Sequence, residues 1–498
     1  MSCQQQTTLN SENANIQQPD PPTFNKQFNP SFKMYMVLAT LLLCTPALGD
    51  RVAYHKWLTD NENVQLSNKL DLSTNTPTVL DDVKEGEILF SINTNTVLFP
   101  TGTDDYPAFS KVLKDTETTK LMSPTIRLAL LLMYEKQERG KESFWWPMLN
   151  NLPTGSASTV FWPEEELKML NGTAIFSKTI ERISAVANLH RALEPMMIST
   201  TDQTPLFETF TAADLLVAVN HIFARTISAA TSVFSAQHGF GSSDGAIPIM
   251  IPFIESLPRS ISPTVHVDIR AMSDADADTA ADASHSIVLI ANRDLKKNEL
   301  LLLNADLGKT NTELLLHTGQ FILHNEHHGV PLYIRLSATD PQFEIKTKIL
   351  KQLNLTNGSE FLVNTTGIPP MPLLKMLRIQ LLEFHNLDSY TKILRQDEPI
   401  SLSNELMVVR ALWYATESLS NKFTNRTIEY EIELLESFNN ANGSDEPRSM
   451  TRIEVAAHLR LSEKRILASL SIWVRNHWLG MIDRKQLELY DLQEFRLR

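Results

Sequence analysis

The order of hydrophobic patterns along the chain limits its fold more than any single motif does. Strand-like segments come first, at residues 69–72 and 83–98, and helical periodicity then runs through residues 108–230. Strand patterns return at residues 247–254 and 286–303, and beyond about residue 340 the pattern is almost wholly helical. A β-rich module that is interrupted by helices and followed by a helical unit predicts an α+β protein.

Size and charge narrow the class of protein further. The chain has 498 residues, which is too long for one ordinary hydrophobic core and indicates two domains. The net charge is −13, and no run of five or more Lys or Arg residues occurs. A surface that neutralises phosphates is therefore not expected, and we predict that the protein does not bind nucleic acid.

The N-terminal region predicts that the protein enters the secretory pathway. Residues 1–33 are polar and rich in Gln, Asn and Pro, which predicts a disordered extension. Residues 34–49 follow Lys33, are apolar, and end in Ala-Leu-Gly, as a signal peptide or an uncleaved signal anchor does. Such an anchor would be the protein's only membrane contact, and translation from Met34 or Met36 would place the signal at the start. The alternative is a buried segment of a cytoplasmic protein.

Cysteine use and glycosylation sequons bear on the same question. Cys3 and Cys44 are the only cysteines, so a chain cleaved after Gly49 has no disulfide, no thiolate metal site and no cysteine nucleophile. A lumenal protein with these sequons would be a glycoprotein. The six sequons begin at Asn171, Asn354, Asn357, Asn364, Asn425 and Asn442.

Residues 291–316, in the second half of the chain, read ANRDLKKNELLLLNADLGKTNTELLL. This segment resembles the end of a SET domain, the protein-methyltransferase fold. Asn311 and Glu313 match the family pattern, in which a Tyr-Gly pair precedes Asn, one residue, and Glu-Leu-Leu. By count, that tyrosine falls on Asp306. The pattern keeps the scaffold residues and lacks the reactive tyrosine.

Markers in the same order over residues 54–489 resemble RuBisCO large-subunit lysine methyltransferases. They are Tyr54-His-Lys-Trp57-Leu58, Asp82-Val-Lys-Glu-Gly86-Glu87, Trp146-Pro147 through Leu152-Pro153, Phe161-Trp162 through Thr173, and Arg460-Leu-Ser-Glu463-Lys464-Arg-Ile-Leu467. The resemblance implies an N-terminal SET-like domain over residues 50–340, with a helical insert at about 108–235. It also implies an all-helical substrate-binding-like domain over residues 341–498.

The resemblance implies S-adenosyl-L-methionine (AdoMet) as cofactor if the protein is active, and no cofactor otherwise. The Gly-x-Gly turn that lets backbone approach the cofactor falls on Thr74 and Thr76, and no glycine occurs between Asp50 and Glu85. Arg225 stands where the family arginine faces the amino-acid end of the cofactor. Arginine can pair with a carboxylate through two hydrogen bonds.

Two further devices of the family are altered. In the "Pro, two residues, Asp, two residues, Asn-His" segment, Glu255, Pro258 and Arg259 stand for Asp, Asn and His. We therefore predict Arg225, Glu255 and Arg259 as cofactor-binding residues. The second family tyrosine falls on Thr318, and no tyrosine lies between Tyr134 and Tyr333. The catalytic residue stays unknown, with Asp306 at the expected tyrosine position.

Two further segments contain histidine and are weaker candidates for functional residues. Asn220-His221 resembles the missing Asn-His pair but lies within a helical pattern, so we interpret it as unrelated. His324, His327 and His328 could converge on a metal, but a solvated loop is the preferred interpretation and no metal site is predicted.

Three functions remain open from the sequence. The first is a SET-like pseudoenzyme with reduced or lost catalysis that binds a protein partner through its C-terminal helical domain. The second is an active AdoMet-dependent protein N-methyltransferase with a rebuilt site, whose acceptor is a lysine or histidine side chain. The third is an unrelated secreted or membrane-anchored protein.

Overall fold

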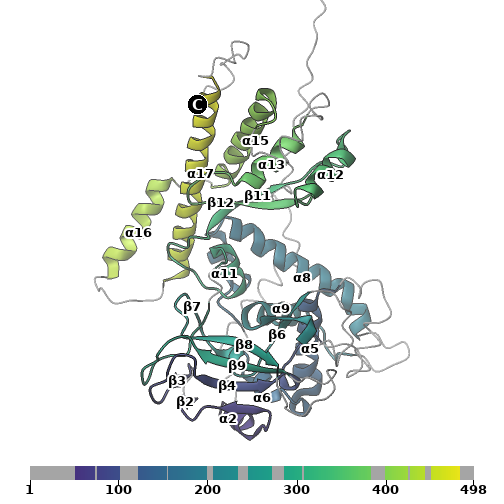
Figure 1. Cartoon of the computed structure of the whole chain (residues 1–498), viewed down its shortest axis with the longest axis vertical. Coiled ribbons are helices and arrows are strands. Elements are labelled where there is room, and N and C mark those ends of the chain that lie inside the picture. The colour runs from purple at the N-terminus through teal and green to yellow at the C-terminus, as the bar shows by residue number, and fades with distance from the viewer. Residues whose placement is uncertain are drawn as a thin grey trace, which may run out of the picture.

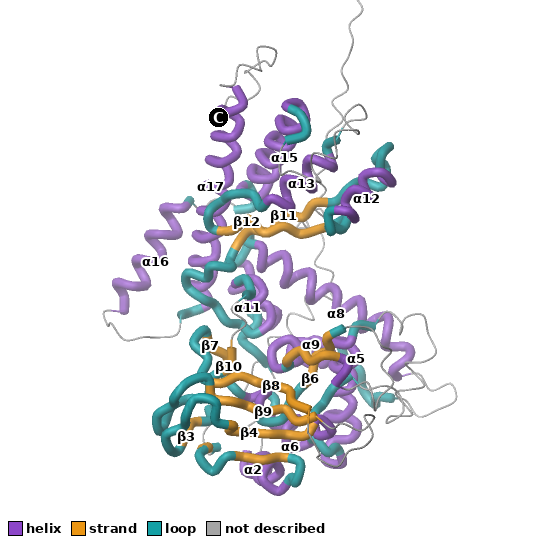
Figure 2. Tube along the Cα trace, in the orientation of Figure 1, coloured by secondary structure: helices purple, strands orange, loops and turns teal. Residues whose placement is uncertain are grey.

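A computed structural model describes residues 51–72, 76–100, 122–153, 155–198, 206–233, 245–271, 285–304, 308–382, 399–423, 427–442 and 450–482. The expected N-terminal extension and signal segment lie outside these residues, as do Thr74 and Asp306. In Figures 1 and 2 a lower, sheet-containing body carries an upper body of helices and one hairpin.

The lower body is built on a four-stranded antiparallel sheet in the order β1-β4-β9-β8. Its strands are β1 (Val64–Leu66), β4 (Ile88–Asn93), β9 (His285–Ala291) and β8 (Val265–Ala271). β9 reads HSIVLIA, and its last five residues are all buried. β-branched and aliphatic side chains in such a run favour a strand that is covered on both faces. The sheet joins segments some two hundred residues apart, and this pairing brings both sides of the helical insert together.

Three short ladders surround this sheet. They are β2 (Leu70–Asp71) with β3 (Thr78–Val79), β5 (Ile227–Ala230) with β6 (Ala246–Ile249), and the parallel pair β7 (Arg259–Ser260) with β10 (Leu303–Asn304). β5 is a strand within the stretch that the sequence predicted as helical, because it pairs in register with β6 after the last insert helix has ended.

The helical insert follows β4 in the chain. Its helices are α5 (Pro124–Tyr134), α6 (Trp146–Asn151), α7 (Glu164–Lys168), α8 (Ala174–Ile198) and α9 (Ala212–Arg225), and α2 (Arg51–Asp60) packs beside α6. Ser123 caps α5 and Thr211 caps α9, each by accepting a hydrogen bond from a first-turn backbone N–H group. α9 thus has a defined start, and its C-terminal residue is Arg225.

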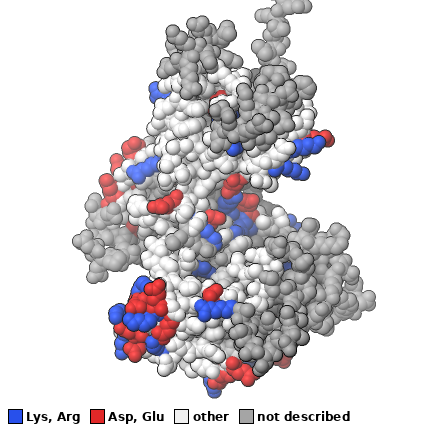
Figure 3. Space-filling model, in the orientation of Figure 1, with Lys and Arg blue, Asp and Glu red and all other residues white. Residues whose placement is uncertain are grey.

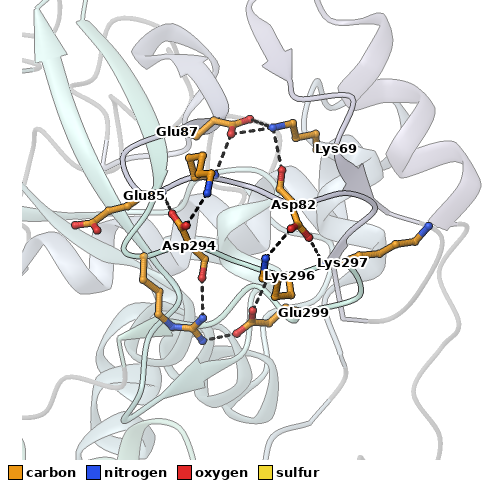
Figure 4. Close-up of polar contacts among 10 residues, drawn as sticks. Lys69, Asp82, Glu85, Glu87, Asp294, Lys296, Lys297 and Glu299 are labelled. Carbon is orange, nitrogen blue, oxygen red and sulfur yellow. Dashed lines mark hydrogen bonds and ion pairs between the residues drawn. The ribbon is translucent and has the colours of Figure 1, made fainter.

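Two turns with the same sequence pattern lock together at the edge of the sheet. Residues 82–88 read DVKEGEI and residues 294–300 read DLKKNEL, and Gly86 and Asn298 both have positive φ. Figure 4 shows the reciprocal contacts, with Asp82 accepting from the Lys296 ammonium at 2.7 Å and the Lys297 N–H at 3.2 Å. Asp294 accepts in the same way from the Lys84 ammonium at 2.8 Å and the Glu85 N–H at 3.0 Å.

These charges form a dense mixed patch on the face shown in Figure 3, beside β2 and β3. The Lys296 hydrogen bond holds the pKa of Asp82 below its usual range, and the Lys84 hydrogen bond does the same for Asp294. Because each turn satisfies donors of the other, the patch joins the two halves of the sheet that the insert separates in sequence. Opposite charges are paired within it, so we interpret it as structural.

The upper body contains a hairpin as well as helices, which corrects the prediction of an all-helical domain. β11 (Gly329–Ile334) pairs antiparallel with β12 (Ser359–Asn364) over six residues each. Phe361 and Val363 alternate inward, and Gly358 has φ 84° at the start of β12. This two-residue period in a short run is typical of a strand, and the helical pattern on both sides obscured it.

The helices of this body are α12 (Phe343–Gln352), α13 (Met371–Gln380), α15 (Leu402–Ser420), α16 (Ile428–Asn442) and α17 (Arg452–Ile482). α11 (Asn311–His317) connects the two bodies in the chain. Arg378 of α13 binds Glu405 of α15 through two hydrogen bonds of 2.8 and 2.9 Å. Both side chains are buried, and charge-assisted pairs of this kind leave little freedom in how the helices pack.

α17 belongs to both hydrophobic cores. Val455, Ala456 and Leu459 pack into the core of the lower body, and the later residues of the helix pack into the core of the upper body. Those later residues are Ile466, Leu467, Leu470, Val474 and Met481. A helix of 31 residues extends about 46 Å, so one rigid element spans the junction.

Polar contacts fix α17 against the insert. Both carboxyl oxygens of Glu463 lie within hydrogen-bond distance of the backbone N–H of Ala174 at the start of α8, at 3.0 and 3.2 Å. The Arg460 guanidinium donates to the carbonyl of Met169, and it also pairs with the buried carboxylate of Glu431. Burial raises the pKa of Glu463 to about 8. A neutral Glu463 is therefore the favoured form at the junction.

We expect Glu463→Gln to remove a pH dependence of stability. Because the folded pKa is above the unfolded value, the fold is less favourable once Glu463 ionises, and stability falls as pH rises from about 4.5 to about 8. Glutamine keeps an acceptor for Ala174 and carries no charge. The thermal midpoint of the wild type should fall over this range more than that of Glu463→Gln. Equal slopes in a melting series would contradict the prediction, and Glu433→Gln on α16 is the control.

Candidate functional site

The structure brings the three predicted cofactor-binding residues into one cluster. Arg225 ends α9, Glu255 lies in the short 3-10 helix Ile254–Ser256, and Arg259 starts β7. The Nη1 group of Arg225 donates to the backbone carbonyl of Glu255 at 2.9 Å. The end of the insert and the segment after β6 therefore meet at these side chains.

Tyr54 of α2 is a fourth member of this cluster. Its hydroxyl donates to Oε1 of Glu255 at 3.0 Å and accepts from the backbone N–H of Phe253 at 2.6 Å. The sequence analysis used Tyr54 only as a helix marker. A signal was present, because the resembling pattern has Phe at this position and Asp at that of Glu255. The hydroxyl that tyrosine has and phenylalanine lacks contacts the carboxyl group of glutamate, which is one methylene longer than aspartate.

Burial dominates the electrostatics of Glu255. Only 5% of the residue is exposed, and burial raises its pKa to about 7. The Tyr54 hydrogen bond and the charge of Arg225 oppose this increase. Oε2 of Glu255 is buried and has no hydrogen-bond partner among the described residues. The site thus holds one unsatisfied carboxyl oxygen.

Arg225 supplies the opposite charge. Its pKa is lowered, chiefly by burial, and the carboxyl of Glu255 partly opposes this effect. Within the described chain, the Nη1 contact with Glu255 is the one hydrogen bond of its guanidinium. The remaining N–H groups are donors for an anionic group, and the charge of Arg225 acts on the carboxyl group of Glu255.

Arg259 is used differently from Arg225. Its Nε donates to the carbonyl of Ala224 at 3.3 Å, and its Nη2 donates to that of Thr226 at 3.0 Å. Nη1 donates to the carbonyl of Asn304 at 3.4 Å. This guanidinium therefore ties the end of α9 to β10. These three hydrogen bonds of Arg259 are all with backbone carbonyl groups.

The residues in and next to α11 that match the SET pattern make structural hydrogen bonds. Thr310 and Glu313 form a complete capping box at the start of the helix. The side chain of Asn311 donates to the carbonyl of Ile322 at 2.9 Å and accepts from its N–H at 3.1 Å. Thr318 turns its hydroxyl back to the carbonyl of Leu314 at 2.9 Å. At this second tyrosine position the hydroxyl completes the helix end.

The other sequence candidates have mixed outcomes. Thr76 is exposed before β3, while Thr74 and Asp306 lie outside the described residues. Asn220 and His221 are buried within α9, as expected of an unrelated helix pair. Burial, with the charges of Arg225 and Lys136, holds the pKa of His221 well below its usual range.

The histidine segment follows α11. His328 is buried, and burial lowers its pKa to about 4, whereas His324 and His327 are exposed. In the described ranges, no three His, Cys, Asp or Glu side chains gather in a way that could hold a metal ion.

We expect Arg259→Lys to destabilise the fold by about 1–3 kcal/mol, because three separate nitrogens of Arg259 reach the carbonyls of Ala224, Thr226 and Asn304, whereas the donors of lysine share one nitrogen. Urea denaturation followed by circular dichroism measures the change. The matched control is Arg270→Lys on β8, whose guanidinium is exposed and pairs with Asp268 two residues away. An equal effect of both substitutions would refute the role given to Arg259.

Comparison with known proteins shows what this chain resembles. The family model described as "Rubisco LSMT substrate-binding" matches residues 337–467. A chloroplastic [fructose-bisphosphate aldolase]-lysine N-methyltransferase of Arabidopsis thaliana is 27% identical over 359 residues, which are 70% of this chain and 68% of the relative. An actin-histidine N-methyltransferase of Xenopus tropicalis is 23% identical over 69% of this chain and 55% of its own length.

The fold has a close counterpart among solved structures. The SET domain of LSMT bound to lysine and AdoHcy superimposes with a TM-score of 0.69 and 20% identity, over 89% of this chain and 96% of that one. The α+β fold class predicted from the sequence is therefore confirmed.

Proposed function

We propose that this chain, a SET-domain protein of the same type as RuBisCO LSMT, binds a protein partner through its C-terminal domain and has reduced or lost methyl transfer. The observation that carries this proposal is the state of the reacting end of the site. Thr318 at one family tyrosine position directs its hydroxyl to Leu314. By sequence count the other tyrosine position is Asp306.

Loss of the family tyrosine is expected to lower the rate of methyl transfer strongly. A preorganised polar group that stabilises charge in a transition state typically contributes ~3–4 kcal/mol, or roughly a factor of 10²–10³. No tyrosine occurs between Tyr134 and Tyr333, so a tyrosine from elsewhere in this part of the chain does not replace it.

The upper body supports the binding half of the proposal. It has its own hydrophobic core and the buried Arg378–Glu405 pair, and α17 attaches it rigidly to the lower body. Tyr414 on α15 and Ile472 on α17 are at least half exposed. Exposed aromatic and aliphatic side chains on a rigid domain are suited to protein contact.

The second candidate is an active protein N-methyltransferase with a rebuilt site, and the Arg225–Glu255 pair favours it. A guanidinium with unused N–H groups, whose charge acts on a carboxyl group with an unsatisfied oxygen, complements a zwitterion. These residues fit the amino-acid end of AdoMet, whose bound form would supply the methyl group. The relatives act on lysine or histidine, so the acceptor would be one of these side chains.

We also propose an address in the secretory pathway, with the cytoplasm as the alternative. The segment that predicts it lies outside the described residues, and none of the described helices is long and apolar enough to span a bilayer. Asn354 and Asn364 are exposed sequon residues, whereas the side chain of Asn357 donates to the carbonyl of Leu336. Glycan removal from the protein purified from its source should lower its mass if the secretory address holds.

A transfer assay separates the two candidate functions. We expect the full chain, incubated with methyl-labelled AdoMet and an extract of its source cells, to label no protein above the level of an Arg225→Ala variant. The first candidate also requires that wild type and Arg225→Ala hold the same partner with equal affinity, because the partner binds elsewhere. Label on a lysine or histidine that Arg225→Ala abolishes would establish the second candidate. Arg270→Ala serves as the matched control for loss of a cation.

A further inference from the structure

The hydroxyl of Tyr54 holds two separate groups of the site in place. Tyr54 is 5% exposed, and its single oxygen contacts both the Phe253 N–H and Oε1 of Glu255. Phe253 has φ 73°, a conformation that a bulky residue rarely adopts. Such strain persists where surrounding contacts enforce it, and the Tyr54 hydroxyl is one of those contacts.

Because Oε1 accepts from Tyr54, a proton on Glu255 resides on Oε2. The charged and titratable groups around the carboxyl are Tyr54 from α2, Arg225 from α9 and, beyond Arg225, Arg259 from β7 and His221 from α9. Burial raises the pKa of Tyr54 well above its usual value and lowers that of His221, so both stay neutral near pH 7. Glu255 is thus the group of this cluster that changes charge near neutrality.

We propose that Tyr54 is a positioning residue that presents Oε2 of Glu255 to the ammonium group of a zwitterionic ligand, so that binding of this ligand requires loss of the Oε2 proton. The carboxylate of the ligand meets the unused N–H groups of Arg225. The ligand keeps all its ammonium hydrogens, and the proton from Oε2 passes to solvent. This inference rests on retention of AdoMet or its product, as in the second candidate function.

The proposal ties affinity to pH with a defined sign. The pKa of Glu255 is about 7 in the free protein, and an ammonium partner lowers it in the complex. Affinity should therefore be constant above about pH 7 and fall about tenfold for each pH unit below it. The pH at which affinity begins to fall is the break of this profile. Tyr54→Phe removes a donor that stabilises the carboxylate, so the break should move about one unit higher in pH.

The experiment is titration calorimetry of the full chain with S-adenosylhomocysteine over a pH series, in buffers of different ionisation enthalpy. Wild type should release close to one proton per ligand below the break, and Glu255→Gln should bind more weakly with no break. Methylthioadenosine, which lacks the amino-acid end, should bind independently of pH and of Tyr54→Phe. Tyr333→Phe on β11 is the control for loss of a phenol hydroxyl.

A second measurement does not depend on the ligand. Infrared titration in a Glu463→Gln background, which removes the carboxyl group with a pKa of about 8, should show a protonated carboxyl stretch of Glu255 that disappears at about pH 7. The stretch should disappear at higher pH when Tyr54→Phe is added, and it should be absent when Glu255→Gln is added. Circular dichroism melting establishes that each variant is folded.

Two results would overturn the inference in distinguishable ways. Tight binding of S-adenosylhomocysteine with the same pH profile in wild type and Tyr54→Phe leaves cofactor retention standing and removes the role of Tyr54. An absence of binding at every pH removes cofactor retention itself and with it the ligand that Oε2 would meet. In that second case the infrared titration alone reports whether Tyr54 sets the ionisation of Glu255.

Discussion

The structure depends on one helix that is part of two hydrophobic cores. The first turns of α17 pack with the sheet-containing body, and its later turns form the centre of the C-terminal body. Burying apolar surface in both cores contributes more than the exposed ion pairs of the molecule can, because such pairs are worth little in water. The polar contacts of Glu463 and Arg460 then select one arrangement of the helix against α7–α8.

The site itself shows departures from the SET pattern that compensate one another. Tyr54 adds a hydroxyl, and the longer Glu255 places a carboxyl oxygen where that hydroxyl can reach it. Arg259 replaces a histidine and closes the end of α9 by donating to backbone carbonyls. At a position where the SET pattern has tyrosine, Thr318 completes a helix end. The end that would recognise an amino-acid group thus keeps charged groups, and the end that would perform the transfer lacks the phenol of the family pattern.

Much of the fold was predictable because it depends on long patterns and local rules. The helical insert is predictable from periodicity over many residues. The N-terminal ends of α5, α9 and α11 are marked by the capping residues Ser123, Thr211 and Thr310. Short strands were predicted less well. β12 lies among helices, and alternation over six residues is too weak a signal to predict a strand within a helical pattern. The strand is stabilised by its pairing with β11, which the sequence does not show. β5 was missed for the same reason, since its register depends on β6.

The sequence by itself determined the class of fold, the order of its parts, and the grouping of Arg225, Glu255 and Arg259 as candidates, because family patterns and residue types are written along the chain. Only the tertiary structure decided what these residues do. Glu255 contacts a tyrosine 201 positions away, Arg225 retains unused donors, and Arg259 binds backbone. The physical reason is that hydrogen-bond partners and burial are set by packing between distant segments. The same carboxyl group is an ordinary acid in water and one with a pKa of about 7 in this core.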